Sequence, residues 1–265
     1  MTSSRAISRG RSWSSHLLVI LVLGLVAATS SACSQAEVSS RRPGAAPATT
    51  SAGTPASTVR ASVVATSLST DFDDGTTTAF SSTSNVSLSG AFARSGPYGA
   101  RAVNTATRGG YLAWSSSRFR YGVRYGRITA WVKVVSHRTG ESVDVLSLKN
   151  ARGSRNFDFY RDPGTGRWRY DLYRFDSELS TMTAVVGRWY LIEALVDFGG
   201  RGGTAYTADL RINGIPQPSI ESTGQVGTTV KSAWFGDPNP DHKHNVRYYD
   251  SLAVDTDATP FAFTH

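Results

Sequence analysis

The sequence predicts an all-β protein, a two-sheet antiparallel sandwich of the jelly-roll type, and three observations carry this prediction. About a dozen short segments after residue 66 alternate apolar with polar residues and are separated by Gly, Asn, Asp and Ser. The chain has 25 Gly, 11 Tyr, 11 Phe and 6 Trp, a composition that favours strands and turns. No segment shows a long 3.6-residue period, so no long helix is expected.

The clearest alternation lies in the segments 128–134 and 206–212. In the first, the even-numbered residues are apolar and are expected to face a core, while Trp131 and Lys133 lie on the opposite face. Asn213-Gly214 follows the second and supplies the two positive φ angles of a tight hairpin turn. Strands are expected near 68–73, 86–89, 100–105, 111–114, 126–136, 142–149, 156–161, 167–175, 181–186, 188–198, 204–212, 232–236 and 246–254.

The first 33 residues have the three parts of a signal for export from the cytoplasm. Arg5, Arg9 and Arg11 form a positive region, and an apolar stretch of twelve residues, 17–28, follows. This stretch is shorter than the ~20 residues of a membrane-spanning helix. Small residues then lead to Cys33. We therefore predict a signal peptide over 1–33.

Cys33 is the only cysteine, so the chain cannot form an internal disulfide. Ser31-Ala32-Cys33 resembles the lipobox of bacterial lipoproteins, although Ser30 stands where that family usually has an aliphatic residue. The resemblance implies that Cys33 is lipidated and anchors the mature chain to a membrane. The alternative is ordinary cleavage after Ala32 and free secretion. Either way, the protein is expected outside the cytoplasm.

Residues 34–66 are predicted to form a disordered linker of Pro, Ala, Ser, Thr and Gly, because they offer almost no large apolar side chains to bury. The domain is expected over 67–265. It carries 22 basic and 19 acidic side chains of the chain's 28 and 20, so most of the net charge of +8 lies before it. Nucleic acid is therefore not an expected partner.

Five short motifs follow one another between residues 68 and 256. They are Asp71-Phe72-Asp73-Asp74-Gly75, Ser95-Gly96-Pro97-Tyr98-Gly99-Ala100, Gly187-Arg188-Trp189-Tyr190, Leu210-Arg211-Ile212-Asn213-Gly214 and Tyr248-Tyr249-Asp250. Their order and spacing resemble the concanavalin A-like lectin/glucanase jelly rolls, which include laminin-G-like and carbohydrate-binding modules. The resemblance implies a jelly-roll sandwich and an extracellular polysaccharide as partner.

The enzymes of that family place Glu-x-Asp-x-Glu or Gln-x-His on a strand, and neither motif occurs in this sequence. The absence counts against the family's known hydrolases and lyases. Glu193 remains as a weak catalytic candidate, because it lies between Leu191 and Leu195 on a strongly apolar strand. A buried carboxylate there would have a raised pKa and act as acid or base. The simpler interpretation is a Glu paired with an arginine.

A structural calcium ion is predicted at Asp71, Asp73 and Asp250, because the resemblance places the first and last strands side by side and Ca²⁺ takes carboxylate oxygens. The alternative is that Asp-Asp-Gly forms an ordinary turn. The loop 237–245 carries His242 and His244, but histidines on a Pro-rich loop are more typical of solvent-exposed residues than of metal ligands.

A glycan-binding platform needs aromatic rings beside hydrogen-bonding groups. Seven residues on the more polar strand faces meet this need, and a concave sheet would bring them together. They are Trp131, Lys133, Asp158, Tyr160, Arg169, Asp171 and Tyr173. The competing interpretation is that half of them, Trp131 above all, belong to the sandwich core.

Three functions follow from these observations. The preferred hypothesis is a surface-tethered or secreted carbohydrate-binding, lectin-like module. The alternatives are a polysaccharide lyase or glycoside hydrolase with an unfamiliar site, and an envelope structural or protein-interaction jelly roll. A row of exposed aromatic and Arg side chains favours the first. A buried carboxylate beside Arg, Tyr or His favours the second, and an exposed apolar patch favours the third.

Overall fold

The computed structural model describes residues 66–119, 124–150, 154–172, 176–199, 205–223, 229–257 and 259–263. The predictions for the signal peptide, Cys33 and the linker up to residue 65, and the position of Tyr173, lie outside these residues. None of the helices in the described ranges is long and apolar enough to cross a membrane.

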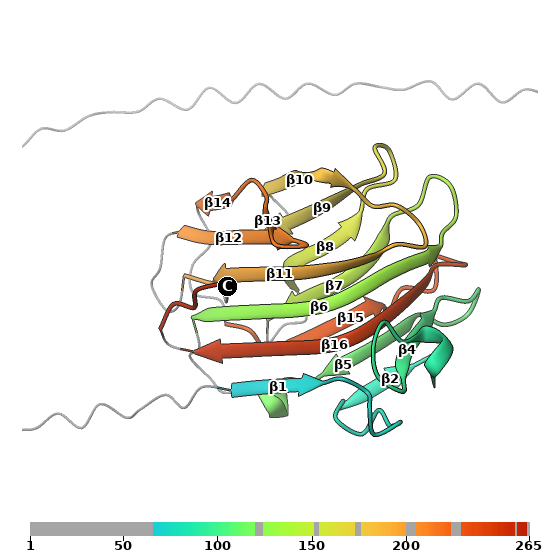
Figure 1. Cartoon of the computed structure of the whole chain (residues 1–265). Helices are drawn as coiled ribbons and strands as arrows, with labels where there is room; N and C mark the ends of the chain where they lie inside the picture. The colour runs from blue at the N-terminus through green and yellow to red at the C-terminus, as the bar shows by residue number, and fades with distance from the viewer. Residues whose placement is uncertain are drawn as a thin grey trace, which may run out of the picture. The chain divides into compact units, whose positions relative to one another are not determined.

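The described residues form two antiparallel sheets packed face to face, with two short 3₁₀ turns at Gly90–Phe92 and Ser116–Arg118 (Figure 1). The nine-stranded sheet runs β13 (Ile215–Pro216), β12 (Ala205–Ile212), β11 (Trp189–Asp197), β6 (Tyr125–Ser136), β16 (Val246–Asp257), β4 (Gly99–Val103) and β3 (Val86–Ser89). In addition, β1 (Thr66–Thr70) pairs with β16, and β14 (Ile220–Thr223) pairs with β12.

The seven-stranded sheet lies behind the first in Figure 1. It runs β10 (Asp176–Thr183), β9 (Arg167–Leu172), β8 (Arg155–Arg161), β7 (Val143–Lys149), β15 (Ser232–Asp237), β5 (Gly110–Trp114) and β2 (Ser82–Ser84). The predicted all-β, two-sheet antiparallel sandwich is therefore confirmed.

The core lies between the sheets, and the predicted strand faces supply it. Ile128, Ala130, Val132 and Val134 of β6 are all buried, while Trp131 and its odd-numbered neighbours are partly exposed. In β12, the described apolar residues of the predicted face are buried in the same way. The hairpin turn forms as expected, with φ of 54° at Asn213 and 76° at Gly214. Period-two alternation thus fixes the orientation of both strands.

The observed strands differ from the predictions in three respects. β1 ends at Thr70, not at 73, because Phe72 turns to a positive φ of 63° and Gly75 donates to the carbonyl of Phe72. The last strand of the 167–186 region spans 176–183, in a Ser- and Thr-rich stretch whose alternation is weak. The short strands β2, β13 and β14 were not predicted. β1 does pair with β16, so the first and last strands are neighbours as expected.

Candidate functional site

The outer face of the seven-stranded sheet carries an unusual set of charged and aromatic side chains. Across β7, β8 and β9, Leu148, Phe157, Phe159 and Trp168 point into the core. The residues between them face outward, so Ser147 of β7 aligns with Asp158 of β8 and Asp171 of β9. The two sides of this sheet therefore have opposite chemistry.

Two β-bulges add charged groups to this outer face. The pairing of β7 with β8 shifts between Asp144 and Leu146, and again between Leu148 and Lys149. Strict alternation would turn Asp144 toward the core with Leu146 of β7, and Arg155 toward the core with Phe157 of β8. The bulges re-aim both residues outward, where Arg155 Nη1 donates to Asp144 Oδ2 at 2.8 Å.

Arg155 also bridges to Asp158, whose Oδ2 lies 3.4 Å from the same guanidinium nitrogen. Asp158 is only 7% exposed, and its Oδ1 has no hydrogen-bond partner. Burial raises the pKa of Asp158 to about 7; Arg155 opposes the shift, while Asp144 and Asp171 add to it. This carboxyl group therefore changes charge near neutral pH.

A second network lies one strand further along the sheet. The Tyr160 hydroxyl donates to Asp171 Oδ2 at 3.0 Å, and Arg169 lies 3.6 Å from Asp171 and 3.5 Å from Asp162. Burial and the neighbouring Asp171 carboxylate raise the pKa of Tyr160, so its hydroxyl stays protonated. Arg169 keeps 36% of its side chain exposed and is open to a ligand.

On the other flank, Lys149 lies over Trp234 of β15. Its Nζ is 3.8 Å from the Trp234 ring centroid, and the Tyr111 ring packs against Trp234 at 4.6 Å between centroids. Burial lowers the pKa of Lys149, and Arg155 adds to this effect. Trp234 remains partly exposed. A cation and two aromatic rings thus border the carboxylate cluster.

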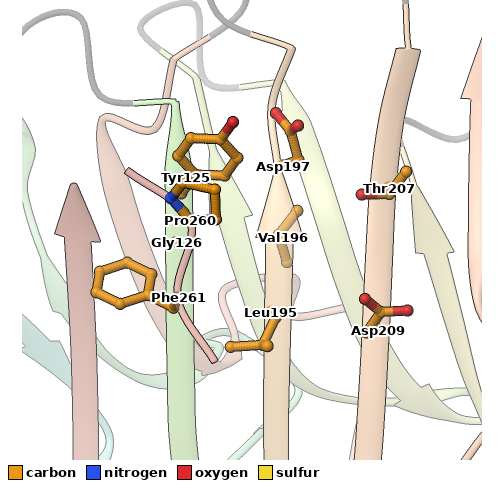
Figure 2. A pocket seen from close by; sticks show the side chains of 9 residues that line it. All are labelled: Tyr125, Gly126, Leu195, Val196, Asp197, Thr207, Asp209, Pro260 and Phe261. Carbon is orange, nitrogen blue, oxygen red and sulfur yellow. The ribbon is translucent and has the colours of Figure 1, made fainter. Parts of the chain in front are cut away.

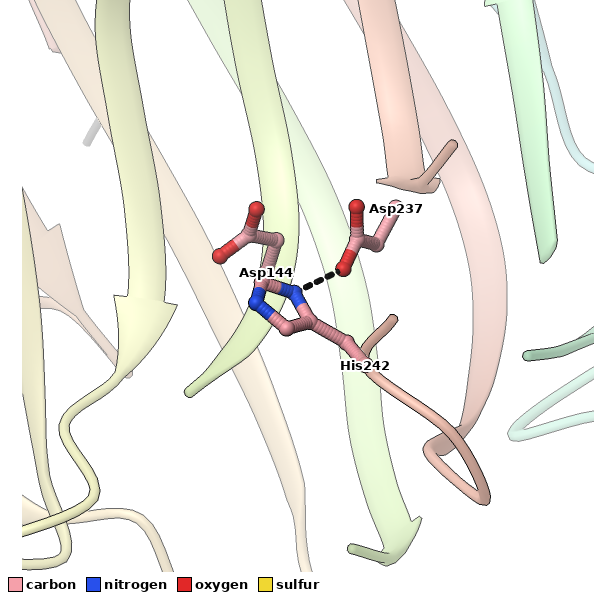
Figure 3. Close-up of side chains that lie close together, drawn as sticks. All are labelled: Asp144, Asp237 and His242. Atoms are coloured by element: carbon pink, nitrogen blue, oxygen red, sulfur yellow. Dashed lines mark hydrogen bonds and ion pairs between the residues drawn. The ribbon is translucent and has the colours of Figure 1, made fainter. Parts of the chain in front are cut away.

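Asp237, at the end of β15, contacts His242 of the following loop (Figure 3). His242 Nδ1 lies 2.5 Å from Asp237 Oδ2, while Asp237 Oδ1 accepts the backbone N–H of Asn239 at 2.8 Å. Asp237 is fully buried, and the His242 side chain is 27% exposed. Asp144 lies beside this pair, so one imidazole and two carboxylates converge.

The seven predicted platform residues do not share one surface. Asp158, Tyr160, Arg169 and Asp171 lie together on the outer face of the seven-stranded sheet. Trp131 and Lys133 lie on β6, in the other sheet, and Tyr173 is outside the described residues. The expected single platform is therefore corrected, because the strands carrying these residues enter different sheets.

Trp131 and Lys133 take part in cation–π contacts on the outer face of the nine-stranded sheet. Trp131 is partly exposed, so it is not a core residue, and the Arg94 guanidinium lies 3.5 Å from its ring centroid. Lys133 Nζ is 4.9 Å from the Trp189 ring and 4.8 Å from the Tyr248 ring. Arg94 and Lys133 thus already occupy positions over these rings.

Glu193 also lies on the outer face of the nine-stranded sheet. Cross-strand pairing places it opposite Arg211 of β12 and Thr129 of β6, and it lines a shallow hollow with Trp131. Glu193 is partly exposed, so it is not the buried carboxylate that its apolar neighbours suggested. Its register opposite Arg211 makes that arginine the candidate partner in the simpler interpretation of this residue.

A second hollow on the same sheet, of about 270 Å³, lies beside the C-terminal segment that carries Pro260 and Phe261 (Figure 2). Its lining includes Leu195 and Val196 of β11, with Asp197 at one end. Asp197 is held by a two-pronged ion pair with Arg124, the closer contact being 2.6 Å. Its carboxylate is thus committed to Arg124.

Two of the three predicted calcium ligands, Asp73 and Asp250, contact the loop at residues 94–96. Asp250 Oδ2 accepts the backbone N–H of Arg94 at 2.8 Å and of Ser95 at 2.9 Å. Asp73 lies against Gly96, where an added Cβ would come within 2.2 Å of Asp73 Oδ1. Partial desolvation raises the pKa of Asp73, and the nearby carboxylates of Asp71 and Asp250 add to the shift. Asp71 and Asp250 thus lie near enough to Asp73 to act on its pKa, but these three acids are not a group with ligand atoms within 4.8 Å of one another, and Asp250 holds the loop.

Sequence reasoning missed five residues of the outer face: Asp144, Lys149, Arg155, Trp234 and Asp237. Lys149 and Trp234 fit the alternation of their strands and could have been found from it. Asp144 and Arg155 could not, because the bulges reverse their orientation. The sequence shows His242 only as a histidine on a Pro-rich loop, and it does not reveal that the Asp237 side chain contacts its ring.

Neither a protein-family model nor a curated protein sequence matches the chain. Among solved structures, an endo-β-1,4-glucuronan lyase from the fungus Trichoderma reesei is similar with a TM-score of 0.52 and 10% identity, over 66% of this chain and 90% of the lyase. The cellulose induced protein Cip1 has a TM-score of 0.52 and 14% identity, over 74% of this chain and 99% of Cip1. A Trypanosoma rangeli sialidase has a TM-score of 0.50 and 13% identity, over 68% of this chain but 27% of the sialidase. At these identities the likeness establishes a shared β-sandwich fold.

Proposed function

We propose that the chain is a carbohydrate-binding module of the concanavalin A-like class, and that it binds an extracellular polysaccharide on the outer face of the seven-stranded sheet. One observation carries the proposal. Four adjacent strands, β15, β7, β8 and β9, present aromatic and charged side chains on this one face. Strands are 4.7–4.9 Å apart, so the row spans roughly 15 Å, enough for an extended glycan segment.

The groups on this face fit the chemistry of sugar recognition. The partly exposed Tyr160 ring offers an apolar surface to sugar C–H groups, and Arg169 offers donors to hydroxyl oxygens. Trp234 is also partly exposed, although Lys149 lies over its ring and Tyr111 packs against it. Asp158 is largely buried, and it holds Arg155 in position. The shared fold with a glucuronan lyase and a sialidase supports testing glycans before other partners.

Two substitutions on the seven-stranded sheet and a control on the nine-stranded sheet test the proposal. Trp234→Ala and Arg169→Ala are expected to weaken polysaccharide binding by about tenfold or more, since each removes a side chain of the row, and tenfold is about 1.4 kcal/mol. Trp131→Ala, on the other sheet, is the matched control and is expected to bind as the parent chain does. Binding is measured by glycan array and polysaccharide pull-down. Loss with Trp131→Ala alone would move the site to the nine-stranded sheet.

A second candidate function is cleavage of the bound polysaccharide, and the buried Asp158 favours it. Asp158 has a pKa of about 7, so at neutral pH its carboxyl group can both donate and accept a proton, as a general acid or base must. It lies beside Arg155 and on the same face as Tyr160. The test is product formation from each polysaccharide that the chain binds. If bound polysaccharides keep their length after prolonged incubation, binding alone is the function.

We also propose that Cys33 is lipidated and tethers the domain to a membrane through the linker. In cells of a lipoprotein-producing bacterium, Cys33→Ala is expected to shift the protein from the membrane fraction to the medium, because the acyl chains that hold it are lost. Ser34→Ala keeps the cysteine and is expected to stay membrane-bound. Equal release of the parent chain and Cys33→Ala contradicts lipid anchoring and leaves free secretion.

A structural calcium ion at Asp71, Asp73 and Asp250 remains part of the proposal. The raised pKa of Asp73, to which Asp71 and Asp250 contribute, supports it, because a cation would relieve this repulsion. Glycan binding measured after EDTA treatment and again after addition of Ca²⁺ tests whether the ion matters for recognition.

A further inference from the structure

We propose that Asp144, Asp237 and His242 form a binding site for a divalent transition-metal ion of the Zn²⁺ type. Each of the three residues offers one ligand atom, and these atoms lie within 4.8 Å of one another. Among the residues that the structure describes, this is the one such group of His, Cys, Asp and Glu side chains. The inference does not depend on glycan binding, although the site lies on the same face.

The geometry needs little adjustment to accept an ion. With metal–ligand bonds of 2.0–2.2 Å, the ligand atoms of a tetrahedral zinc site lie roughly 3.4 Å apart. His242 Nδ1 and Asp237 Oδ2 are already closer than this, at 2.5 Å, and an ion between them would replace the proton that they share. Figure 3 shows the imidazole of His242 lying between the two carboxylates. Small side-chain rotations therefore suffice.

The surrounding charges also favour a cation. Asp237 is fully buried, and His242 is its ion partner among the described residues. Asp144 and Asp158 share one guanidinium nitrogen of Arg155, and Lys149 is the other cation that acts on Asp144, Asp158 and Asp237, so three carboxylates face two cations. Buried carboxylates that lack full compensation are costly, and a bound dication relieves that cost.

A separate observation points to the same place. Asp158 is more than nine-tenths buried, yet its Oδ1 accepts no hydrogen bond. Asp158 faces the same side of the sheet as Asp144, on the neighbouring strand, and both contact Arg155. Buried polar atoms normally have a partner, so this open oxygen marks a position for a group such as a metal-bound water.

The donor set selects the type of ion. Two carboxylates and one imidazole suit Zn²⁺ or Mn²⁺ better than Ca²⁺, which prefers six to eight oxygen ligands. Three protein ligands leave a coordination position open for water or a ligand. Arg155 on Asp144 and the Asn239 N–H on Asp237 orient both carboxylates. His242 is partly exposed, so an ion can enter from solvent.

Calorimetric titration of the metal-stripped full chain with Zn²⁺ tests the site. All proteins are free of affinity tags and carry Cys33→Ser, so that the only thiol cannot bind zinc. We expect one Zn²⁺ per chain, and His242→Ala should weaken binding by more than about 100-fold, beyond the 10–100-fold typical of losing an outer-shell partner. His244→Ala, two residues further along the same loop, is the matched control and should bind normally.

A second variant distinguishes the loss of a metal ligand from misfolding of the loop that carries His242. Asp144→Asn lies on β7, away from the loop, and should also weaken Zn²⁺ binding while the circular dichroism spectrum stays unchanged. Co²⁺ in place of Zn²⁺ should give the intense visible absorption of a four-coordinate site, and His242→Ala should abolish it. Unchanged Zn²⁺ affinity in folded His242→Ala and Asp144→Asn overturns the proposal, as does a parent chain that binds no Zn²⁺.

Discussion

Asp158→Asn is expected to stabilise the domain relative to the parent chain, and increasingly so as the pH rises. The folded-state pKa of Asp158 is about 7, well above the ordinary value of 3.8, because burial disfavours the charged carboxylate. Between these values the folded state holds a proton that the unfolded state has released, so the parent loses stability as the pH rises. The two pKa values are about three units apart, so the free energy of unfolding of the parent is expected to fall by about 4 kcal/mol between them.

The measurement is the free energy of urea unfolding for both proteins from about pH 4 to about pH 8, in buffers that contain EDTA. The difference between variant and parent should grow with pH and level off above about pH 7. Asp74→Asn is the control with the opposite sign, because hydrogen bonds from Thr76 lower the pKa of the exposed Asp74. Its loss of stability should fade as the pH falls. A stability difference for Asp158→Asn that stays constant with pH contradicts the raised pKa.

The sequence was sufficient to predict the sandwich because most strands repeat a two-residue pattern. In β6, the residues from Ile128 to Val134 alternate without interruption, and the structure buries the predicted face. The pattern failed where hydrophobic contrast was weak, as in β10, or where backbone geometry changed direction, as at Phe72. Local sequence records which residues share a strand face, and turns of this kind depend on the surrounding packing.

The candidate site was only partly predictable for two physical reasons. Alternation placed Asp158 and Trp131 on polar strand faces, but it did not reveal that β8 and β6 belong to different sheets. The bulges in the β7–β8 pair then turned Asp144 and Arg155 outward against the period of their own strands. Sheet assignment and bulges are properties of strand pairing, so a single strand's sequence does not contain them.

Arg247 of β16 is another residue whose orientation depends on strand pairing, but here the side chain is turned into the core. A register shift between Val246 and Arg247 places it opposite Val134, on the inward face, and it is 0% exposed. Its Nη1 donates to the backbone carbonyl of Asp144 at 3.1 Å, and its Nη2 donates to Asn104 Oδ1. One guanidinium therefore connects β16 to β7, which carries Asp144, and to Asn104, which follows β4.

Arg247→Ala is expected to lower the free energy of unfolding by about 3–5 kcal/mol, because lost hydrogen bonds to buried acceptors cost about 1–3 kcal/mol each and the cavity adds to this loss. The substitution removes a buried donor from the Asp144 carbonyl and from Asn104 Oδ1, which keeps the Gly110 N–H, and it opens a cavity. Arg247→Met keeps most of the volume and isolates the hydrogen-bond part of the loss. Arg138→Ala is the control: its side chain is 62% exposed and pairs with Glu141, so it should cost less than about 1 kcal/mol.

The indirect effect of Arg247 on the site follows from Asn104. The Asn104 side-chain amide donates to the backbone carbonyls of Asp237 at 3.3 Å and Asn239 at 2.8 Å, at the start of the loop that carries His242. Without Arg247, Asn104 Oδ1 keeps the Gly110 N–H but loses its second donor, so the residue that anchors the loop is held less firmly. Urea unfolding and Zn²⁺ titration of Arg247→Met should therefore both change. A variant that is destabilised but binds Zn²⁺ like the parent would assign Arg247 to the core alone.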